Sequence, residues 1–317
     1  MKAIVLREFG PVENLRHEEV DDPAPAAGQV RIAVALAGVH LVDTIIRRGT
    51  SHGPYPQPVL PAIPGREVAG VVDALGPGVD QGWLGRRVVA HLGRASAGYA
   101  ELAVREVDAV HALPDGLAAD AAVAMIGTGR TTMAILEVAQ ITADDTVLVT
   151  AAAGGIGSLL VQAARSAGAR VISAAGGPEK VAQVRADLAV DYNEPGWTEA
   201  VGEVTVALDG VGGELGRGAL ERLAVGGRLI VFGGASGAPI QFDVGDLYRR
   251  GLTVSAAIGP RILNRPGGIR ELEERALAAA ADGTLTPALT RFPLADAAAA
   301  HAAIENRATI GKVVLVP

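Results

Sequence analysis

The stretch VLVTAAAGGIGSLLVQAARSAGARVI, residues 147–172, decides the fold of this 317-residue chain. A β-branched apolar strand pattern runs into a glycine-rich turn, and an amphipathic helical pattern begins at once. The N-terminus of a helix presents unpaired N–H groups and a positive dipole end, and glycine lets an anion approach that backbone closely. Ala152 stands where the strict Gly-x-Gly-x-x-Gly pattern has its first glycine. Within a βαβ unit the turn still predicts binding of a dinucleotide pyrophosphate. Its residues are Gly154, Gly155, Ile156 and Gly157.

The rest of the chain shows two kinds of pattern. From about residue 120, strands alternate with helices, which predicts an α/β domain with a doubly wound parallel sheet. Residues 1–112 contain short strands separated by Pro and Gly clusters, which predicts an antiparallel, barrel-like domain. The closing strand at 312–316 is expected to return to that first domain.

The periodicity also predicts the individual elements. Strands are expected at 2–6, 30–36, 67–75, 86–90, 99–104, 146–150, 170–175, 204–209, 227–233, 252–258 and 312–316. Helices are expected at 41–48, 119–139, 156–167, 178–187, 214–223, 267–282 and 295–305.

The end of the strand at 170–175 bears on the choice of cofactor. An NAD-binding domain usually has Asp or Glu there, about 20 residues beyond the glycines, to bind the ribose 2′-hydroxyl. This chain has SAAGGPEK at 173–180, with no acid before Glu179. Ser173, Gly176 and Gly177 leave room for a 2′-phosphate. Lys180 can neutralise it, unless Lys180 is only a solvated helix lysine. The pattern favours NADPH over NADH.

Composition and charge exclude several classes of protein. With 28 Lys+Arg against 35 Asp+Glu, the net charge is −7, whereas a nucleic-acid-binding protein needs a basic face. The absence of cysteine excludes disulfides, a catalytic thiol and cysteine-ligated zinc. Glycines interrupt the uncharged run at 146–164, and the start MKAIVLREFG has too short an apolar run for a secretory signal. These observations predict a cytoplasmic protein with no nucleic-acid or membrane partner.

Segments from both halves of the chain share a family pattern. They are TAAAGGIGSLLVQAARSAGARVI, GGPEK, IENRATIGKVVLVP, AGVHLVDTIIRRG (37–49) and PYPQPVLPAIPGREVAGVV (54–72). Together they resemble the zinc-independent quinone oxidoreductases of the medium-chain dehydrogenase/reductase superfamily. The resemblance implies a GroES-like barrel substrate domain at 1–122 and 260–317 and a Rossmann domain at 123–259. It also implies NADPH in the cleft between them, and a homodimer formed through the edge strand at 252–258.

The resemblance also assigns cofactor contacts. It places Tyr192 and Lys180 beside the adenosine 2′-phosphate, although Tyr192 could equally be a half-buried residue that covers the end of the sheet. Phe232, Gly233 and Ser236 would approach the nicotinamide half of NADPH. Thr131 would join them, although its spacing to the next strand is one residue shorter than the family pattern.

The same resemblance addresses the metal question. Zinc-dependent relatives have ligands in Gly-Val-Cys-x-x-Asp and Gly-His-Glu segments, which here contain His40 and Arg66 instead. Arg66 is a permanent cation where a neutral imidazole is needed, so no metal is expected. His40, Asp43 and Glu67 remain an alternative, weak metal site. Typical zinc-free members have Asn at the position of His40.

The leading functional hypothesis is hydride transfer from NADPH to a quinone. His40 and Tyr55 are the candidate donors to a developing oxyanion, and Asp43 could anchor the loop or orient His40. His40 could also be a cleft histidine without a chemical role, and Tyr55 an apolar lid. One alternative is the reduction of α,β-unsaturated carbonyls or enoyl thioesters. An alternative of another class is an NADPH-binding structural or sensor protein with little turnover.

Overall fold

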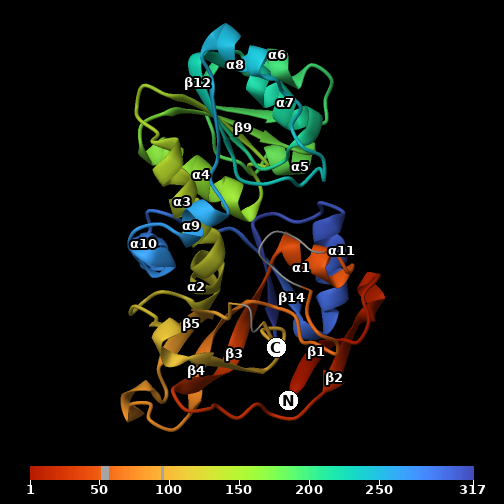
Figure 1. Cartoon of the computed structure of the whole chain (residues 1–317), viewed down its shortest axis with the longest axis vertical. Coiled ribbons are helices and arrows are strands. Elements are labelled where there is room, and N and C mark those ends of the chain that lie inside the picture. Colours follow the sequence, from red (N-terminus) through yellow and green to blue (C-terminus); the bar gives the residue numbers. More distant parts are fainter. Residues whose placement is uncertain (51–56, 94–95) are drawn as a thin grey trace. The chain divides into compact units, whose positions relative to one another are not determined.

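The computed structural model describes residues 1–50, 57–93 and 96–317. These residues divide into two compact units, which Figure 1 shows in colours that follow the chain. The first unit comprises 1–128 and 287–317, and the second unit comprises 129–286. The N- and C-terminal segments therefore share a unit, as expected. The units divide at residue 286 rather than at the predicted 260, because α10 packs against α3 of the second unit.

The first unit is built on a mainly antiparallel sheet with the strand order β14-β15-β3-β4-β5-β7, and β6 also pairs with β3. β14 and β15 run parallel, and β1 pairs with β2 in a separate antiparallel ladder. The strands are β1 (Lys2–Leu6), β2 (Leu15–Glu19), β3 (Gln29–Val39), β4 (Glu67–Leu75), β5 (Arg87–His91), β6 (Leu102–Glu106), β7 (Val110–Ala112), β14 (Leu289–Pro293) and β15 (Lys312–Val316). Its helices are α1 (Leu41–Arg47), α2 (Ala119–Ala124) and α11 (Ala297–Glu305), with 3₁₀ turns η1 (Val12–Asn14), η2 (Gln81–Trp83), η3 (Val107–Ala109) and η5 (Leu294–Asp296).

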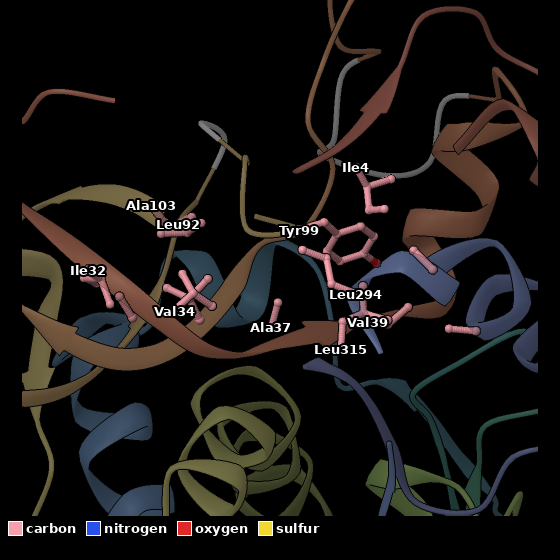
Figure 2. Close-up of a cluster of buried hydrophobic side chains, with 14 of the residues drawn as sticks. Ile4, Ile32, Val34, Ala37, Val39, Leu92, Tyr99, Ala103, Leu294 and Leu315 are labelled. Atoms are coloured by element: carbon pink, nitrogen blue, oxygen red, sulfur yellow. The ribbon is translucent and has the colours of Figure 1, made fainter. Parts of the chain in front are cut away.

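The core of the first unit is continuous across these strands. Alternate residues along β3, such as Val30, Ile32 and Val34, are buried, as expected for a sheet with one face on a core. Figure 2 shows Tyr99 among apolar side chains of this core, with Ile4 and Leu294 near its ring. Tyr99 is fully buried, so its hydroxyl needs a partner inside the unit.

The second unit has a parallel sheet with the order β10-β9-β8-β11-β12-β13. The chain therefore runs outward from β8 in both directions, which is the doubly wound arrangement predicted from the sequence. Its strands are β8 (Thr146–Thr150), β9 (Arg170–Ala175), β10 (Leu188–Asp191), β11 (Val204–Asp209), β12 (Leu223–Val231) and β13 (Thr253–Ala256). Its helices are α3 (Arg130–Ala139), α4 (Gly155–Ser166), α5 (Pro178–Val181), α6 (Trp197–Val201), α7 (Gly213–Glu221), α8 (Val244–Arg250), α9 (Pro260–Leu263) and α10 (Gly268–Ala281).

Apolar residues of the second sheet alternate between two cores. Val147 and Val149 of β8 pack with residues of α3 and α4, whereas Leu148 packs with residues of α6 and α7. Burial on both faces explains why the strand is continuously apolar. No helix of the described residues is long and apolar enough to cross a membrane.

Some predicted elements differ from the observed ones. The helix expected at 119–139 is interrupted by a π-helical turn, η4 (Met125–Gly129), which separates α2 from α3. The helix expected at 178–187 ends at Val181, and the chain then reaches β10, which the periodicity did not predict. A short strand such as β10, with few alternating positions, gives only a weak signal.

Candidate active site

The glycine turn, residues 154–157, joins β8 to α4 as the sequence predicts. A Cβ on Gly157 would lie 2.2 Å from the carbonyl oxygen of Ala151, so α4 can begin this close to the strand only with glycine there. Ala151 itself has a positive φ of 50°, which shows how sharply the backbone turns. The 12-residue helix α4 then presents its first-turn N–H groups at the carboxyl end of β8. This is the geometry that suits a pyrophosphate.

The carboxyl end of β9 holds the predicted 2′-phosphate residues. A Cβ on Gly176 would lie 2.8 Å from Cε2 of Tyr192, so the tyrosine ring lies directly over this glycine. Gly177 follows with a φ of 94°, and Lys180 lies in α5. Ser173, by contrast, is fully buried within β9 and does not widen the strand end as expected.

An acid that the sequence reasoning missed lies at this strand end. Oδ1 of Asp191, at the end of β10, accepts hydrogen bonds from the N–H groups of Gly177 and Asn193, each at 2.9 Å. β10 pairs in parallel with β9, so their carboxyl ends meet at the same edge. The sequence signal was the carboxylate of AVDY at the end of a short apolar run.

The loops after β11 and β12 are tied together. The N–H of Phe232 donates to the carbonyl of Asp209 at 2.8 Å, and that of Ser236 donates to Val211 at 2.8 Å. The buried carboxylate of Asp209 accepts from Thr150 Oγ1 at 2.6 Å and from the N–H of Gly212 at 2.8 Å. The structure thus brings three of the predicted nicotinamide-side residues, Phe232, Gly233 and Ser236, into a braced loop. Thr131 lies apart from it in sequence, in the first turn of α3.

In the first unit, three side chains that carry or can carry charge lie in mutual contact. They are His40, Glu67 and Lys312, and we call them the charged cluster. Nε2 of His40 lies 2.7 Å from Oε1 of Glu67. Nζ of Lys312 lies 2.8 Å from Oε2 of Glu67 and 2.8 Å from Nε2 of His40. Glu67 is fully buried and Lys312 is 4% exposed, whereas the His40 side chain is 26% exposed. Only the histidine can therefore reach a small molecule readily.

Two glycines make room for the carboxylate of the charged cluster. A Cβ on Gly38 would lie 2.3 Å from Oε2 of Glu67, and a Cβ on Gly127 would lie 1.7 Å from Oε1. Burial alone would raise the pKa of Glu67, but the charges of His40 and Lys312 outweigh it and hold that pKa far below its ordinary value. Glu67 is therefore an anion that neutralises its basic neighbours.

The charged cluster does not fit a metal site. The Lys312 ammonium lies against both His40 and Glu67, so a dication bound by them would face a cation at contact distance. Among the described residues, no group of three His, Cys, Asp or Glu side chains is arranged to hold a metal ion. The expected alternative ligand Asp43 is engaged elsewhere.

Asp43 forms a second set of buried contacts, the Asp43 network, with Tyr99 and His301. Its Oδ2 accepts from the backbone N–H of His40 at 2.9 Å and from the Tyr99 hydroxyl at 3.1 Å. The same hydroxyl lies 3.2 Å from Nε2 of His301. Burial raises the pKa of Tyr99 well above its ordinary value and lowers the pKa of His301 to about 4. Asp43 thus fixes the start of α1, and with it His40. Tyr55, the other predicted donor, lies outside the described residues.

Sequence reasoning did not single out Lys312, Tyr99 or His301. The GK of the closing segment was a usable signal for Lys312, because a lysine inside an apolar strand needs a buried anion. No local pattern marks Tyr99 or His301, which come from distant parts of the chain.

Comparisons with known proteins agree with this architecture. Residues 26–135 match the alcohol dehydrogenase GroES-like domain, and residues 184–315 match the zinc-binding dehydrogenase family. The chain is 31% identical to a quinone oxidoreductase of Pseudomonas aeruginosa, over 100% of this chain and 99% of that protein. It is 32% identical to a 2-haloacrylate reductase of Burkholderia, over 100% of this chain and 99% of that protein.

A solved structure extends the likeness to three dimensions. The Escherichia coli quinone oxidoreductase in complex with NADPH has a TM-score of 0.87 and 28% identity, and the match covers 100% of both chains. A GroES-like unit and a doubly wound sheet with a glycine turn define an oxidoreductase of the medium-chain dehydrogenase/reductase superfamily. Within it, the chain belongs to the quinone oxidoreductase family.

Proposed function

We propose that the chain is an NADPH-dependent reductase that transfers a hydride to a quinone. The observation that carries the proposal is the glycine turn, where Gly157 lets α4 begin against the backbone of Ala151. The quinone oxidoreductase relatives, and the NADPH complex of the similar Escherichia coli enzyme, support it. When bound, NADPH supplies the hydride, and the protein supplies binding and orientation.

The cofactor residues proposed from the sequence divide by position. The glycine turn would hold the pyrophosphate through backbone N–H groups. Lys180 and Tyr192 would hold the 2′-phosphate, with Gly177 giving access. Thr131 and the braced loop with Phe232, Gly233 and Ser236 would hold the nicotinamide half.

His40 is the proposed donor to the acceptor oxygen. Glu67 fixes its ring through Nε2, and the nearby Lys312 ammonium adds positive charge where negative charge would develop. Asp43 is a positioning residue, because its carboxylate holds the His40 backbone. Tyr55 stays a proposed second donor. The reaction is proposed to need no zinc, since Lys312 lies where a dication would need to bind.

A second candidate function is the reduction of an α,β-unsaturated carbonyl compound. The 2-haloacrylate reductase among the relatives favours it, because that protein matches as closely as the quinone oxidoreductases. Enoyl thioesters belong to the same chemical class. The remaining alternative is a protein that binds NADPH for a structural or sensing role with little turnover.

The proposed setting is a cytoplasmic homodimer. β13 is the last strand in its sheet order, and Ile258, just beyond it, is 41% exposed. An edge strand of this kind can pair with a second copy.

The test measures NADPH and NADH oxidation with a panel of quinones and enones, for the wild type, Lys180→Ala and His40→Ala. NADPH should be preferred, and Lys180→Ala should weaken NADPH by about tenfold to a hundredfold while hardly affecting NADH. His40→Ala should lower kcat/KM by about a hundredfold with enones and less with quinones, without an equal loss of NADPH binding. NADPH binding without turnover of any acceptor would favour the sensor alternative.

A further inference from the structure

A pocket lies wholly within the first unit, beside the Asp43 network. Its volume is about 240 Å³, which suits a small organic molecule. Its lining combines apolar residues, among them Leu6 and Ile46, with the polar and charged residues Asp43, Arg47, Gln57 and Arg66. The polar members decide what the pocket can bind.

Arg47 lines the pocket from α1 and is 2% exposed. Its Nη1 donates to the carbonyl of Gly10 and its Nη2 to Oε1 of Glu305, each at 2.5 Å. These contacts fix the guanidinium in place. Its Nε is buried and has no hydrogen-bond partner among the described residues. A buried donor of this kind is expected to have a partner, so it points to a bound acceptor.

Gln57 gives an independent indication from another segment. Both polar atoms of its amide, Nε2 and Oε1, are buried and have no hydrogen-bond partner in the described part of the chain. An unsatisfied amide costs stability unless a ligand or solvent pairs with it. Gln57 therefore adds a second donor to the same pocket.

Arg66 supplies a second cation, and its backbone is hydrogen-bonded to a neighbouring strand segment. Its carbonyl accepts from the N–H of Leu92 at 2.6 Å, and its guanidinium Nη2 lies 3.8 Å from Oδ1 of Asp43. Oδ2 of Asp43 also accepts hydrogen bonds from the backbone N–H of His40 and from the Tyr99 hydroxyl, so this carboxylate is shared among several donors. Each guanidinium thus has one carboxylate, Glu305 for Arg47 and Asp43 for Arg66. What favours a ligand rich in acceptor atoms is the pair of buried, unsatisfied donors, Arg47 Nε and Gln57 Nε2.

We infer that this pocket recognises the carboxylate of the acceptor, so that the substrate class is small electrophilic alkenes or quinones bearing a carboxylate. The inference rests on the proposed function. A carboxylate offers about four lone-pair sites, enough for Arg47 Nε, the Arg66 guanidinium and Gln57 Nε2. Leu6, Ile46 and the other apolar lining residues would cover the carbon skeleton.

The test compares 4-oxopent-2-enoate with its methyl ester, which has the same enone without the charge. In the reaction a hydride from NADPH adds to one alkene carbon and a proton to the other, giving 4-oxopentanoate and NADP⁺. We expect kcat/KM of the wild type to be at least about tenfold higher for the acid than for the ester. Arg66→Met should lower this acid-to-ester ratio by about tenfold, towards one. Arg66→Lys should retain part of it, because the charge remains but the planar fork is lost.

The matched control is Arg48→Met. Arg48 follows α1, and its side chain is 52% exposed and lies 3.6 Å from Glu305, outside the pocket lining. The acid-to-ester ratio of this variant should stay within about twofold of the wild type. Gln57→Leu should lower the ratio several-fold, and it tests the pocket even if Arg66→Met does not fold.

Calorimetry with 4-oxopentanoate and its methyl ester separates this inference from the proposed function. If neither acceptor is reduced, the proposed function is wrong, but preferential binding of 4-oxopentanoate would still support the pocket. If both acceptors are reduced at equal kcat/KM and 4-oxopentanoate binds no better than its ester, the enzyme stands and the carboxylate inference is overturned.

Discussion

The glycine turn of the second unit and the charged cluster of the first unit use opposite means to prepare a binding site. The turn is made of neighbouring residues, 154–157, and it works through backbone N–H groups and the absence of side chains. The charged cluster joins His40, Glu67 and Lys312, which are far apart in the chain, and it works through buried charges. The loss of stability and of cofactor binding on substitution in the turn should therefore depend on the size of the group that is added. The loss of stability on substitution in the charged cluster should depend on whether the substitution removes a charge.

The largest effect is expected from breaking the charged cluster. Lys312→Met would leave the fully buried carboxylate of Glu67 without its nearest permanent cation. An uncompensated buried charge costs about 3–5 kcal/mol, so the free energy of unfolding in urea should fall by that amount.

Lys2→Met is the control for this experiment. Lys2 pairs with Glu19 at 3.4 Å, but its side chain is 50% exposed. Its loss should change the free energy of unfolding by no more than about 0.5 kcal/mol. Equal effects of the two substitutions would show that burial does not set the strength of the Lys312 contact.

The second-largest effect is expected from the pH dependence of the buried histidine in the Asp43 network. Burial lowers the pKa of His301 to about 4, below its ordinary value of 6.5. Between pH 6.5 and about pH 4, His301 binds a proton in the unfolded chain but not in the folded chain. The free energy of unfolding therefore falls as the pH drops through this range. For this group the loss amounts to about 2 kcal/mol between pH 7 and pH 5.

His301→Gln removes that titration, whereas His17→Gln replaces an exposed histidine. Urea unfolding at pH 7 and pH 5 should show an acid-side loss about 2 kcal/mol smaller for His301→Gln than for His17→Gln or the wild type. The same pH slope in all three proteins would contradict the assignment of a neutral, buried His301.

The smallest effect tests the turn by size alone. Gly157→Ala would bring a Cβ within 2.2 Å of the Ala151 carbonyl oxygen, whereas Gly154→Ala would meet the same atom at 3.2 Å. Overpacking should outweigh the helix propensity of alanine in the first case, with a net destabilisation of about 1–2 kcal/mol and about tenfold weaker NADPH affinity. Titration with NADPH and urea unfolding of both variants measure this. A larger effect at Gly154 than at Gly157 would refute the close-approach argument.

The pattern of apolar residues and glycines along the chain was enough to predict the parallel sheet and the glycine turn. It also predicted that the last strand returns to the first unit. These features depend on local periodicity and on contiguous residues, and β8, β9 and β11 have the predicted bounds. The resemblance to a family supplied His40 and Asp43 by position, together with Tyr192 and the nicotinamide-side residues. The boundary between the two units was predicted less accurately than the elements themselves. It falls after α10 rather than before it, because a helix pattern does not say against which unit the helix packs.

The sequence by itself thus determined the fold class and the glycine turn. Both depend on residues that are neighbours in the chain: the strand and helix periods, and the glycines where the backbone makes a close approach. Only the tertiary structure decided that Lys312 lies against His40 and Glu67, that Asp191 accepts from Gly177, and that Arg47, Gln57 and Arg66 line one pocket. Contacts between distant segments depend on strand register and on how burial forces each charge to find a partner. Those requirements are met only after the chain has folded.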